Sequence, residues 1–374
     1  MSPLPYGRQW IDDEDIAAVV AVLRSDWLTT GPNVEEFESA FAARTGAAEA
    51  VAVSSGTAAL HLAVAALGIG PGDEVIVPSL TFAASANCVV YCGATPVFAD
   101  VDPETLLLDV ADAERRITPR TRAILAVDYA GQPCDYAALR ALTAAHGLAL
   151  IADASHSLGA TDRDRSVGSL ADLSCFSLHP VKHITTGEGG VVTTDDTDLA
   201  RRLRVLRNHG IGTDHRQRAE NGAWFYEMTE LGFNYRLTDF QCALGVSQLR
   251  KLTGWIELRQ ELAAHYDEAF AAVDGVAPLA RRAGVSHAYH LYVVQVANRD
   301  EVFAGLRDRG IGANVHYVPV HLHPFYRERF GTGPGLCPVA ESAYERILSL
   351  PLFPQLGAED AAFVVAALRA EVSR

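Results

Sequence analysis

Residues 148–160 read LALIADASHSLGA, in which an apolar run ends at Asp153 and small and polar residues follow. A short apolar run bounded by Gly147 and Asp153 predicts a strand that is buried on both faces. Ligands of parallel sheets bind beyond the carboxyl ends of the strands, which is where Asp153 would lie. The alternative is that this carboxylate only caps the N-terminus of a helix.

The segments on either side repeat this pattern. Apolar runs predict strands at residues 49–53, 74–77, 95–98, 123–127, 148–152, 173–177 and 191–194. Between them we expect helices at residues 58–67, 85–91, 110–116 and 135–146. Strands that alternate with helices predict an α/β fold with a largely parallel sheet.

The chain becomes mainly helical after residue 196. A helix is expected at residues 198–208, and residues 209–235 lack a clear period and predict a long loop. Thr238 and Gln241 have the spacing of a capping box, so helices should start there and continue to about residue 273. Alternation then resumes, with a strand at 290–296, a helix at 299–309, a strand at 313–316 and two last helices. We therefore expect a large domain over residues 1–250 and a smaller α/β domain over residues 251–374.

Composition narrows the class of protein. Of the 374 residues 49% are apolar and 21% are charged, which is typical of a packed globular protein. Lys and Arg total 31 against 46 Asp and Glu, a net charge of −15 that argues against nucleic-acid binding. The six cysteines form no CxxC pair, the N-terminus does not resemble a signal peptide, and no apolar run reaches about 18 residues. These features predict a cytoplasmic protein without a membrane span.

A phosphate-binding turn is the first candidate for chemistry. Ser55, Gly56, Thr57 and Ala58 stand between an expected strand and an expected helix. Amide groups at a helix N-terminus attract anions, and glycine lets the backbone approach closely. The alternative is a plain turn in which Thr57 caps the helix.

A lysine in a tight turn is the second candidate. Residues 177–190 read SLHPVKHITTGEGG, so a strand ends at Ser177 and Lys182 follows in a turn bounded by proline and glycine. Burial lowers the pKa of an amine, which suits Schiff-base chemistry. The alternative is a solvated loop lysine.

Two further segments carry polar residues of less certain meaning. Asn234 precedes the capped helix and could simply be a turn residue. In the segment HYVPVHLHP, residues 316–324, the pair His321 and His323 could bind a metal. A substrate pocket or ordinary packing is favoured instead, because no carboxylate or cysteine stands nearby in sequence to complete a metal site.

The order of these features indicates a cofactor. A phosphate-binding turn, an acidic strand end at Asp153 and a turn lysine 29 residues later match the needs of pyridoxal 5′-phosphate. That cofactor requires an anion cradle, a carboxylate beside its ring nitrogen and an amine to bind its aldehyde.

Four motifs carry a resemblance to a known family. They are SGTAALHLA (55–63), DASHSLGA (153–160), FSLHPVKHITTGEGG (176–190) and GFNYRLTDFQCALGVSQL (232–249). With them the sequence resembles the fold-type I, pyridoxal phosphate-dependent sugar aminotransferases of the DegT/DnrJ/EryC1/StrS group over nearly its whole length. PYGRQ (5–9) and HPVK (179–182) are most similar to C4 aminotransferases of pseudaminic-acid biosynthesis. The resemblance implies a large domain with a mostly parallel seven-stranded sheet and a smaller C-terminal α/β domain.

The resemblance also implies roles for individual residues. Lys182 matches the lysine that holds the cofactor covalently, and Asp153 matches the partner of the ring nitrogen. The remaining matches are Thr57, the Ala58 amide and Ser177 for the phosphate, Asn234 for the phosphate of the other subunit, Phe82 for the ring face, and His316, Tyr317 and His321 for the sugar site. His156 stands where many members have glutamine, and either side chain can bond the phenolic oxygen of the ring.

The implied reaction moves an amino group from L-glutamate to a keto sugar linked to a nucleotide, such as a UDP-4-keto-6-deoxy-N-acetylhexosamine at C4. It further implies a homodimer with shared active sites. Rival activities are amination of a keto-cyclitol, 3-dehydration of a sugar and a catalytically silent regulator. The dehydratase is disfavoured because Lys182 occupies the position that holds histidine in those enzymes.

Overall fold

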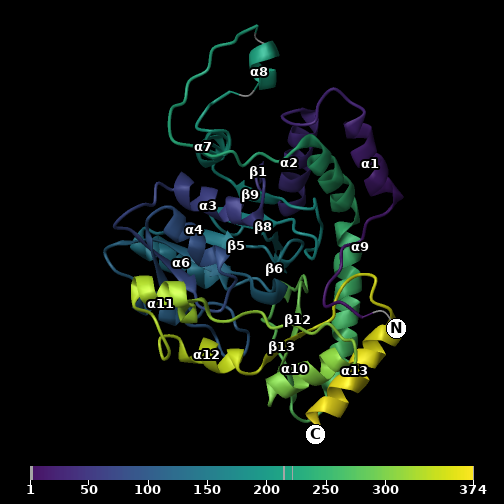
Figure 1. The fold of residues 1–374 in the computed structure, drawn as a ribbon. Helices are drawn as coiled ribbons and strands as arrows, with labels where there is room; N and C mark the ends of the chain where they lie inside the picture. Colours follow the sequence, from purple (N-terminus) through teal and green to yellow (C-terminus); the bar gives the residue numbers. More distant parts are fainter. Residues whose placement is uncertain (1–2, 214, 221, 374) are drawn as a thin grey trace.

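The computed structural model describes residues 3–213, 215–220 and 222–373 (Figure 1). A seven-stranded sheet has the order β1-β9-β8-β5-β4-β2-β3. Its strands are β1 (Glu49–Val53), β2 (Glu74–Pro78), β3 (Thr95–Ala99), β4 (Thr121–Val127), β5 (Ala149–Asp153), β8 (Leu173–Ser177) and β9 (Gly190–Thr194). Only β9 is antiparallel to its neighbours in this sheet, so the predicted, largely parallel sheet is confirmed.

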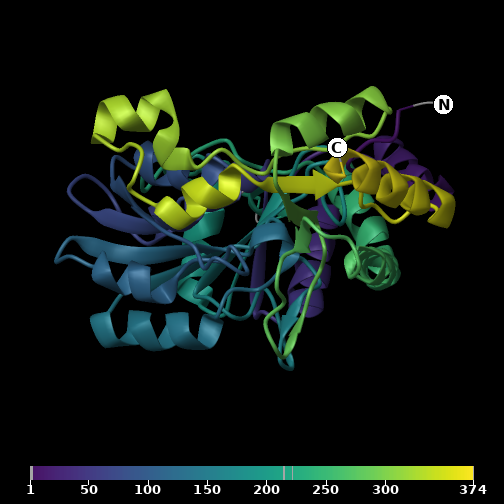
Figure 2. The ribbon, with the colours of Figure 1, turned by 90° about the horizontal axis from the view of Figure 1, so that it is seen from below.

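Helices enclose this sheet, as Figures 1 and 2 show. They include α1 (Asp13–Leu23), α2 (Pro32–Thr45), α3 (Gly56–Ala66), α4 (Ala84–Tyr91), α5 (Val110–Arg115), α6 (Tyr136–His146) and α7 (Thr197–Arg207). All five residues of β2 and of β9 are buried, which explains why these strands are continuous apolar runs rather than alternating ones. The predicted helices in this part of the chain are confirmed to within two residues at each end.

A single long helix links the two halves of the chain. This helix, α9 (Asp239–Phe270), begins at the predicted capping box, in which the side-chain oxygen Oε1 of Gln241 accepts a hydrogen bond from the backbone N–H of Thr238. Residue 250 lies inside α9, and the division of domains there stays a prediction. None of the helices in the described part of the chain combines the length and apolar character needed to span a bilayer.

A second core lies toward the C-terminus. The antiparallel sheet β10 (Val276–Pro278), β12 (Tyr292–Val296) and β13 (Ile347–Leu350) packs with α10 (Arg299–Asp308) and α13 (Ala358–Val372) around its own cluster of buried side chains. The short strands β6 (Thr161–Asp162), β7 (Arg165–Ser166) and β11 (Val285–Ser286) form a third sheet.

The second half of the chain differs from the prediction in three places. Residues 313–316 form no strand, because the Asn314 side chain takes the next backbone N–H and only an isolated bridge to Ser349 remains. The strand β13 was not predicted, and it follows α11 (Pro324–Phe330) and α12 (Pro338–Tyr344). The segment 209–235, expected to be a loop, contains the helix α8 (His215–Glu220) and reaches outward from α7 in Figure 1.

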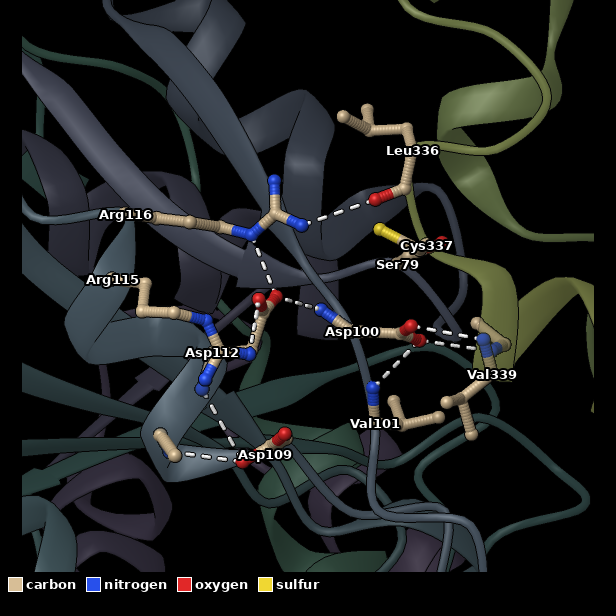
Figure 3. Close-up of polar contacts among 12 residues, drawn as sticks. Ser79, Asp100, Val101, Asp109, Asp112, Arg115, Arg116, Leu336, Cys337 and Val339 are labelled. Atoms are coloured by element: carbon tan, nitrogen blue, oxygen red, sulfur yellow. Dashed lines mark hydrogen bonds and ion pairs between the residues drawn. The ribbon is translucent and has the colours of Figure 1, made fainter.

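Buried carboxylates fix α12 to the large sheet (Figure 3). Asp100, which follows β3, accepts hydrogen bonds from the backbone N–H groups of Val339 and Ala340 at 2.9 and 2.8 Å. Asp112 accepts from the Asp100 backbone N–H at 2.7 Å and from Arg116 at 2.6 Å. These bonds satisfy the free amides of the first turn of α12. They also anchor α12, which follows residues 313–323 in the chain, to the large sheet.

Candidate active site

A cavity of about 480 Å³ opens where β5 and β8 end and α3 begins. Eight of the residues singled out by the sequence line it, namely Thr57, Phe82, Asp153, His156, Ser177, Lys182, His316 and Tyr317. They come from five separate parts of the chain. The fold therefore brings together most of the predicted site residues at the edge of the sheet where parallel strands bind ligands.

Asp153 is the last residue of β5, and its carboxylate is buried. One carboxylate oxygen accepts a hydrogen bond from the Ser85 hydroxyl at 2.6 Å, and the other accepts one from the Ser155 backbone N–H at 3.2 Å. The turn that follows does not become a helix, so the helix-cap alternative is wrong. These donors hold the carboxylate in one orientation at the cavity wall.

Lys182 lies in a turn closed by a hydrogen bond from its backbone N–H to the His179 carbonyl oxygen. Its side chain is half-buried, and its Nζ lies 3.4 Å from Nε2 of His290. Burial lowers the pKa of the Lys182 amine to about 8, although the charge of Asp153 opposes this shift. Near neutral pH a usable share of the amine is therefore unprotonated and nucleophilic.

His156 is buried between two other side chains of the cavity. Its Nε2 lies 3.1 Å from the Tyr317 hydroxyl, and its ring centre lies 4.4 Å from that of His290. Burial, together with Lys182 and other nearby imidazoles, holds the His156 pKa well below its usual range, so the ring is neutral. Its buried Nδ1 has no hydrogen-bond partner among the described residues. A buried polar atom without a partner indicates a place for a ligand group.

The predicted phosphate cradle is closely packed. A Cβ atom on Gly56 would lie 2.7 Å from Cβ of Ser177, so only glycine lets α3 approach β8 this closely. The cap of α3 is Ser55, whose hydroxyl accepts from the Ala58 backbone N–H at 3.0 Å. The alternative in which Thr57 caps the helix is therefore wrong. Thr57 lines the cavity instead.

Aromatic and imidazole groups form the opposite wall. Phe82 is 59% exposed, and its ring centre lies 5.8 Å from that of Tyr317. Nδ1 of His316 lies 2.8 Å from the Ser349 hydroxyl, and burial lowers the His316 pKa to about 4. These side chains enclose the cavity without adding positive charge.

Three predicted residues, Ala58, His321 and Asn234, do not line the cavity. Ala58 is buried, and its backbone N–H donates to the Ser55 hydroxyl. His321 is fully buried, with Nδ1 at 2.5 Å from the Ser79 hydroxyl and Nε2 at 2.9 Å from Glu341. Both ring nitrogens are thus occupied by the protein itself. Asn234 is exposed and forms a backbone bridge with Asn208 outside the cavity. Within the described residues, no group of three or more His, Cys, Asp or Glu side chains is arranged to hold a metal ion.

Sequence reasoning missed two residues of the cavity wall. His290 was interpreted only as the start of a strand, and no local pattern links it to Lys182, which is 108 positions away. Tyr6 stands in the PYGRQ segment, and its ring centre lies 5.3 Å from that of His316. The PYGRQ motif carried part of the family resemblance, and that was the signal in the sequence that could have indicated Tyr6.

Residues 9–369 match the DegT/DnrJ/EryC1/StrS aminotransferase family. The chain belongs to this family. It is 44% identical over 375 residues to the spore coat polysaccharide biosynthesis protein SpsC of Bacillus subtilis, an alignment that covers 98% of this chain and 96% of SpsC. Members of the family that act on sugars use pyridoxal phosphate, and this chain is such a sugar aminotransferase.

Solved structures agree with this assignment. The chain is 31% identical to PseC of Helicobacter pylori, an aminotransferase involved in the biosynthesis of pseudaminic acid, with a TM-score of 0.93 and full coverage of both chains. It is also 31% identical to the pyridoxal phosphate form of the putative sugar aminotransferase Spr1654 of Streptococcus pneumoniae, with a TM-score of 0.93 and 99% coverage of each chain. The fold-type I architecture implied by the sequence motifs is confirmed.

The cavity of this aminotransferase fits its cofactor. The close approach of Gly56 to Ser177 leaves a helix N-terminus open to a phosphate, and Nδ1 of His156 awaits a polar partner. Lys182 and Asp153 line the same cavity, as an amine and a carboxylate must to reach opposite sides of one ring. The donor set is therefore the one that pyridoxal phosphate requires.

Proposed function

We propose that this sugar aminotransferase moves an amino group from L-glutamate to C4 of a UDP-4-keto-6-deoxy-N-acetylhexosamine. The observation that carries the transfer chemistry is the Lys182 amine, with a pKa of about 8, in one cavity with the buried Asp153 carboxylate. The similarity to PseC over the whole chain supports the choice of sugar. A nucleotide-linked substrate also fits a cavity that opens to solvent beside the exposed Phe82.

When bound, pyridoxal phosphate supplies an electron sink for the negative charge that develops on the α-carbon of the amino donor. Lys182 would hold the cofactor and, once released, would remove the α-proton and deliver it to C4′ of the cofactor. Asp153 would keep the ring nitrogen protonated, and the hydrogen bonds from Ser85 and Ser155 would preserve the orientation of its carboxylate. The same residues serve the second half of the reaction in reverse.

The other cavity residues would bind and orient the reactants. Thr57, the Ala58 amide and Ser177 would hold the phosphate, although the Ala58 N–H must then leave or share its bond to Ser55. His156 would bond the phenolic oxygen, and Phe82 would cover the ring. The sugar would meet His316 and Tyr317. His321 drops out as a substrate contact, because Ser79 and Glu341 occupy both of its ring nitrogens.

We further propose a homodimer in which each subunit completes the site of the other. Asn234 is exposed and free to reach a partner's phosphate. The segment before it exposes large apolar side chains that a second copy would cover, namely Trp224, Phe225, Tyr226, Met228 and Leu231.

A neighbouring cavity of about 220 Å³ is lined by two glutamates and by five arginines, one of which is Arg236. Four of these arginines form ion pairs with nearby carboxylates, whereas Arg236 forms none within the described residues, so its guanidinium would suit a phosphate of the substrate. A reducing, cytoplasmic setting is part of this proposal and is supported by six unpaired cysteines.

A substrate panel tests the activity. The enzyme is loaded with pyridoxal phosphate, converted to the pyridoxamine form with L-glutamate, and mixed with single keto substrates while the return of the aldehyde absorbance is followed. We expect return with UDP-4-keto-6-deoxy-N-acetylhexosamine and far slower return with the free sugar. Faster return with a keto-cyclitol would favour the cyclitol activity, and a deoxygenated product without nitrogen would favour a dehydratase. Light scattering of the active enzyme tests the dimer, which a fully active monomer would contradict.

A further inference from the structure

His290 lies directly behind Lys182 on the wall of the active-site cavity. Its ring is buried, and its Nε2 lies 3.4 Å from the lysine Nζ. Its Nδ1 has no hydrogen-bond partner among the described residues. The lysine amine is thus the one polar contact of this ring in the described part of the chain. A buried imidazole that served packing alone would be expected to satisfy its nitrogens elsewhere, as His321 does.

The backbone around His290 is fixed in an unusual conformation. Tyr289, the preceding residue, has φ +48°, a left-handed value that a non-glycine residue adopts only when its surroundings enforce it. A Cβ atom on Gly131 would lie 2.8 Å from the Tyr289 nitrogen and 2.9 Å from the His290 nitrogen. The Leu291 N–H donates to the Ala130 carbonyl oxygen at 3.1 Å. The ring of His290 is therefore presented to Lys182 by a loop with little freedom.

A buried cation is hydrogen-bonded to the same loop. Arg259, from α9, is 1% exposed and donates to the backbone carbonyl oxygens of Tyr289 and Leu352, each at 3.1 Å. Both of these acceptors are neutral. Arg259 therefore holds the loop in place and also makes a second positive charge beside it unfavourable.

Charged and titratable groups reach His290 from each element packed around it. They are His156 after β5, Lys182 and His183 in the turn after β8, and Arg259 on α9. Burial and these neighbours keep the His290 pKa well below its usual range. A neutral ring can accept a hydrogen bond from Lys182, whereas an imidazolium could not.

We propose that His290 is a positioning residue for Lys182, whose free amine donates a hydrogen bond to Nε2 of the neutral ring and is held at the cavity wall by it. This inference rests on the proposed role of Lys182 as the cofactor-binding amine. An acceptor favours the protonated amine, so it offsets part of the effect of burial on that amine. By holding the amine in place, His290 would allow Lys182 both to accept a proton and to release it during the reaction.

The test measures the Lys182 pKa in cofactor-free, full-length enzyme, without any substrate. Acetic anhydride labels only the unprotonated amine, and the extent of labelling of the Lys182 peptide is followed by mass spectrometry from pH 6 to 10. We expect the midpoint near 8 in the native enzyme. His290→Leu should lower it by about one pH unit, because the acceptor is lost and the site becomes more apolar.

His290→Gln is the matched variant, because its amide oxygen can replace Nε2 as the acceptor, and we expect its midpoint to return to the native value. His290→Phe retains the ring volume without an acceptor and substitutes for the leucine variant if that variant does not fold. Equal midpoints in native enzyme and the leucine or phenylalanine variant would overturn the proposal. So would a glutamine variant that behaves like them, since it would show only a packing effect. Failure of native Lys182 to capture pyridoxal phosphate would instead refute its proposed role.

Discussion

Two groups of buried histidines in this molecule differ in how their ring nitrogens are used. His321 lies between the large sheet and α12, and both of its nitrogens have partners, the Ser79 hydroxyl and the Glu341 carboxylate. In the cavity, His156 and His290 each have a buried Nδ1 that no described residue bonds. Both groups would look alike in sequence, as histidines in mostly apolar surroundings.

For these three residues the difference indicates a structural role for His321 and a role at the cofactor site for His156 and His290. It does not extend to every buried histidine, because His316 lines the cavity with its Nδ1 bonded to Ser349, and His183 has an unpaired Nδ1 but does not line the cavity. The hydrogen bond between Nδ1 of His321 and the Ser79 hydroxyl links the segment 313–323 to the sheet. This bond therefore already contributes to the stability of the folded protein. A buried nitrogen without a partner is unfavourable in the empty protein and becomes favourable when a ligand supplies the missing bond. Ser79, His321 and Glu341 even have the residue types of a hydrolytic triad, yet Ser79 is fully buried and lines none of the cavities described above.

Replacing Lys182, the amine in the cavity, should have the largest effect on turnover. Lys182→Arg retains a positive charge but removes the only side-chain amine among the described residues that line the cavity, and a guanidinium stays protonated and is not nucleophilic. We expect turnover to fall on the order of 10⁴-fold or more. Borohydride reduction followed by peptide mapping should then find no pyridoxyl group at position 182. A variant that turns over at a near-native rate would exclude Lys182 from the chemistry.

Replacing the Asp153 carboxylate should cause a smaller loss of activity than replacing Lys182. Asp153→Asn keeps the shape of the side chain and its bond to Ser85, but the amide cannot hold a ring nitrogen protonated. We expect kcat to fall about 10²- to 10³-fold while pyridoxal phosphate still binds. Stopped-flow absorbance with L-glutamate separates the two quantities. Near-normal proton removal from glutamate in this variant would refute the electron-sink role of Asp153.

Local patterns in the sequence predicted the strands of the large sheet well. Features that depend on contacts between residues far apart in sequence could not be predicted. Strands β1 and β8 have the predicted ends, because a strand buried on both faces must be an apolar run. Asp153, Lys182 and the glycine turn were found because each stands at such a strand end. The environments of His290 and His321 depend on partners 108 and 242 positions away, so no local period could reveal them. The strand at 313–316 was predicted wrongly for a related reason, since the Asn314 side-chain oxygen accepts the Val315 backbone N–H that a ladder would have used.

The smallest effects should separate the two histidine groups most directly. His321→Leu leaves the buried Ser79 hydroxyl without its partner, and we expect the free energy of unfolding to fall by about 2 kcal/mol. His156→Leu removes the unpaired Nδ1 and also the Nε2 contact with the Tyr317 hydroxyl. Because Tyr317 lines the cavity, water can replace that contact, so we expect the free energy of unfolding to fall by about 1 kcal/mol or less, while kcat falls about tenfold or more. Urea unfolding of cofactor-free enzyme and steady-state kinetics measure the two quantities on the same samples.

The control is His265→Leu, because His265 is exposed on α9 and should change neither quantity. The comparison requires that His321→Leu mainly lowers stability and that His156→Leu mainly lowers kcat. A general effect of replacing histidine by leucine would not produce these opposite results. If His321→Leu lost more activity than stability, His321 would have to reach the substrate after a rearrangement of its two bonds. If His156→Leu lost as much stability as His321→Leu, the bonds of His156 would contribute as much to folding as those of His321, and the distinction between the two groups would fail.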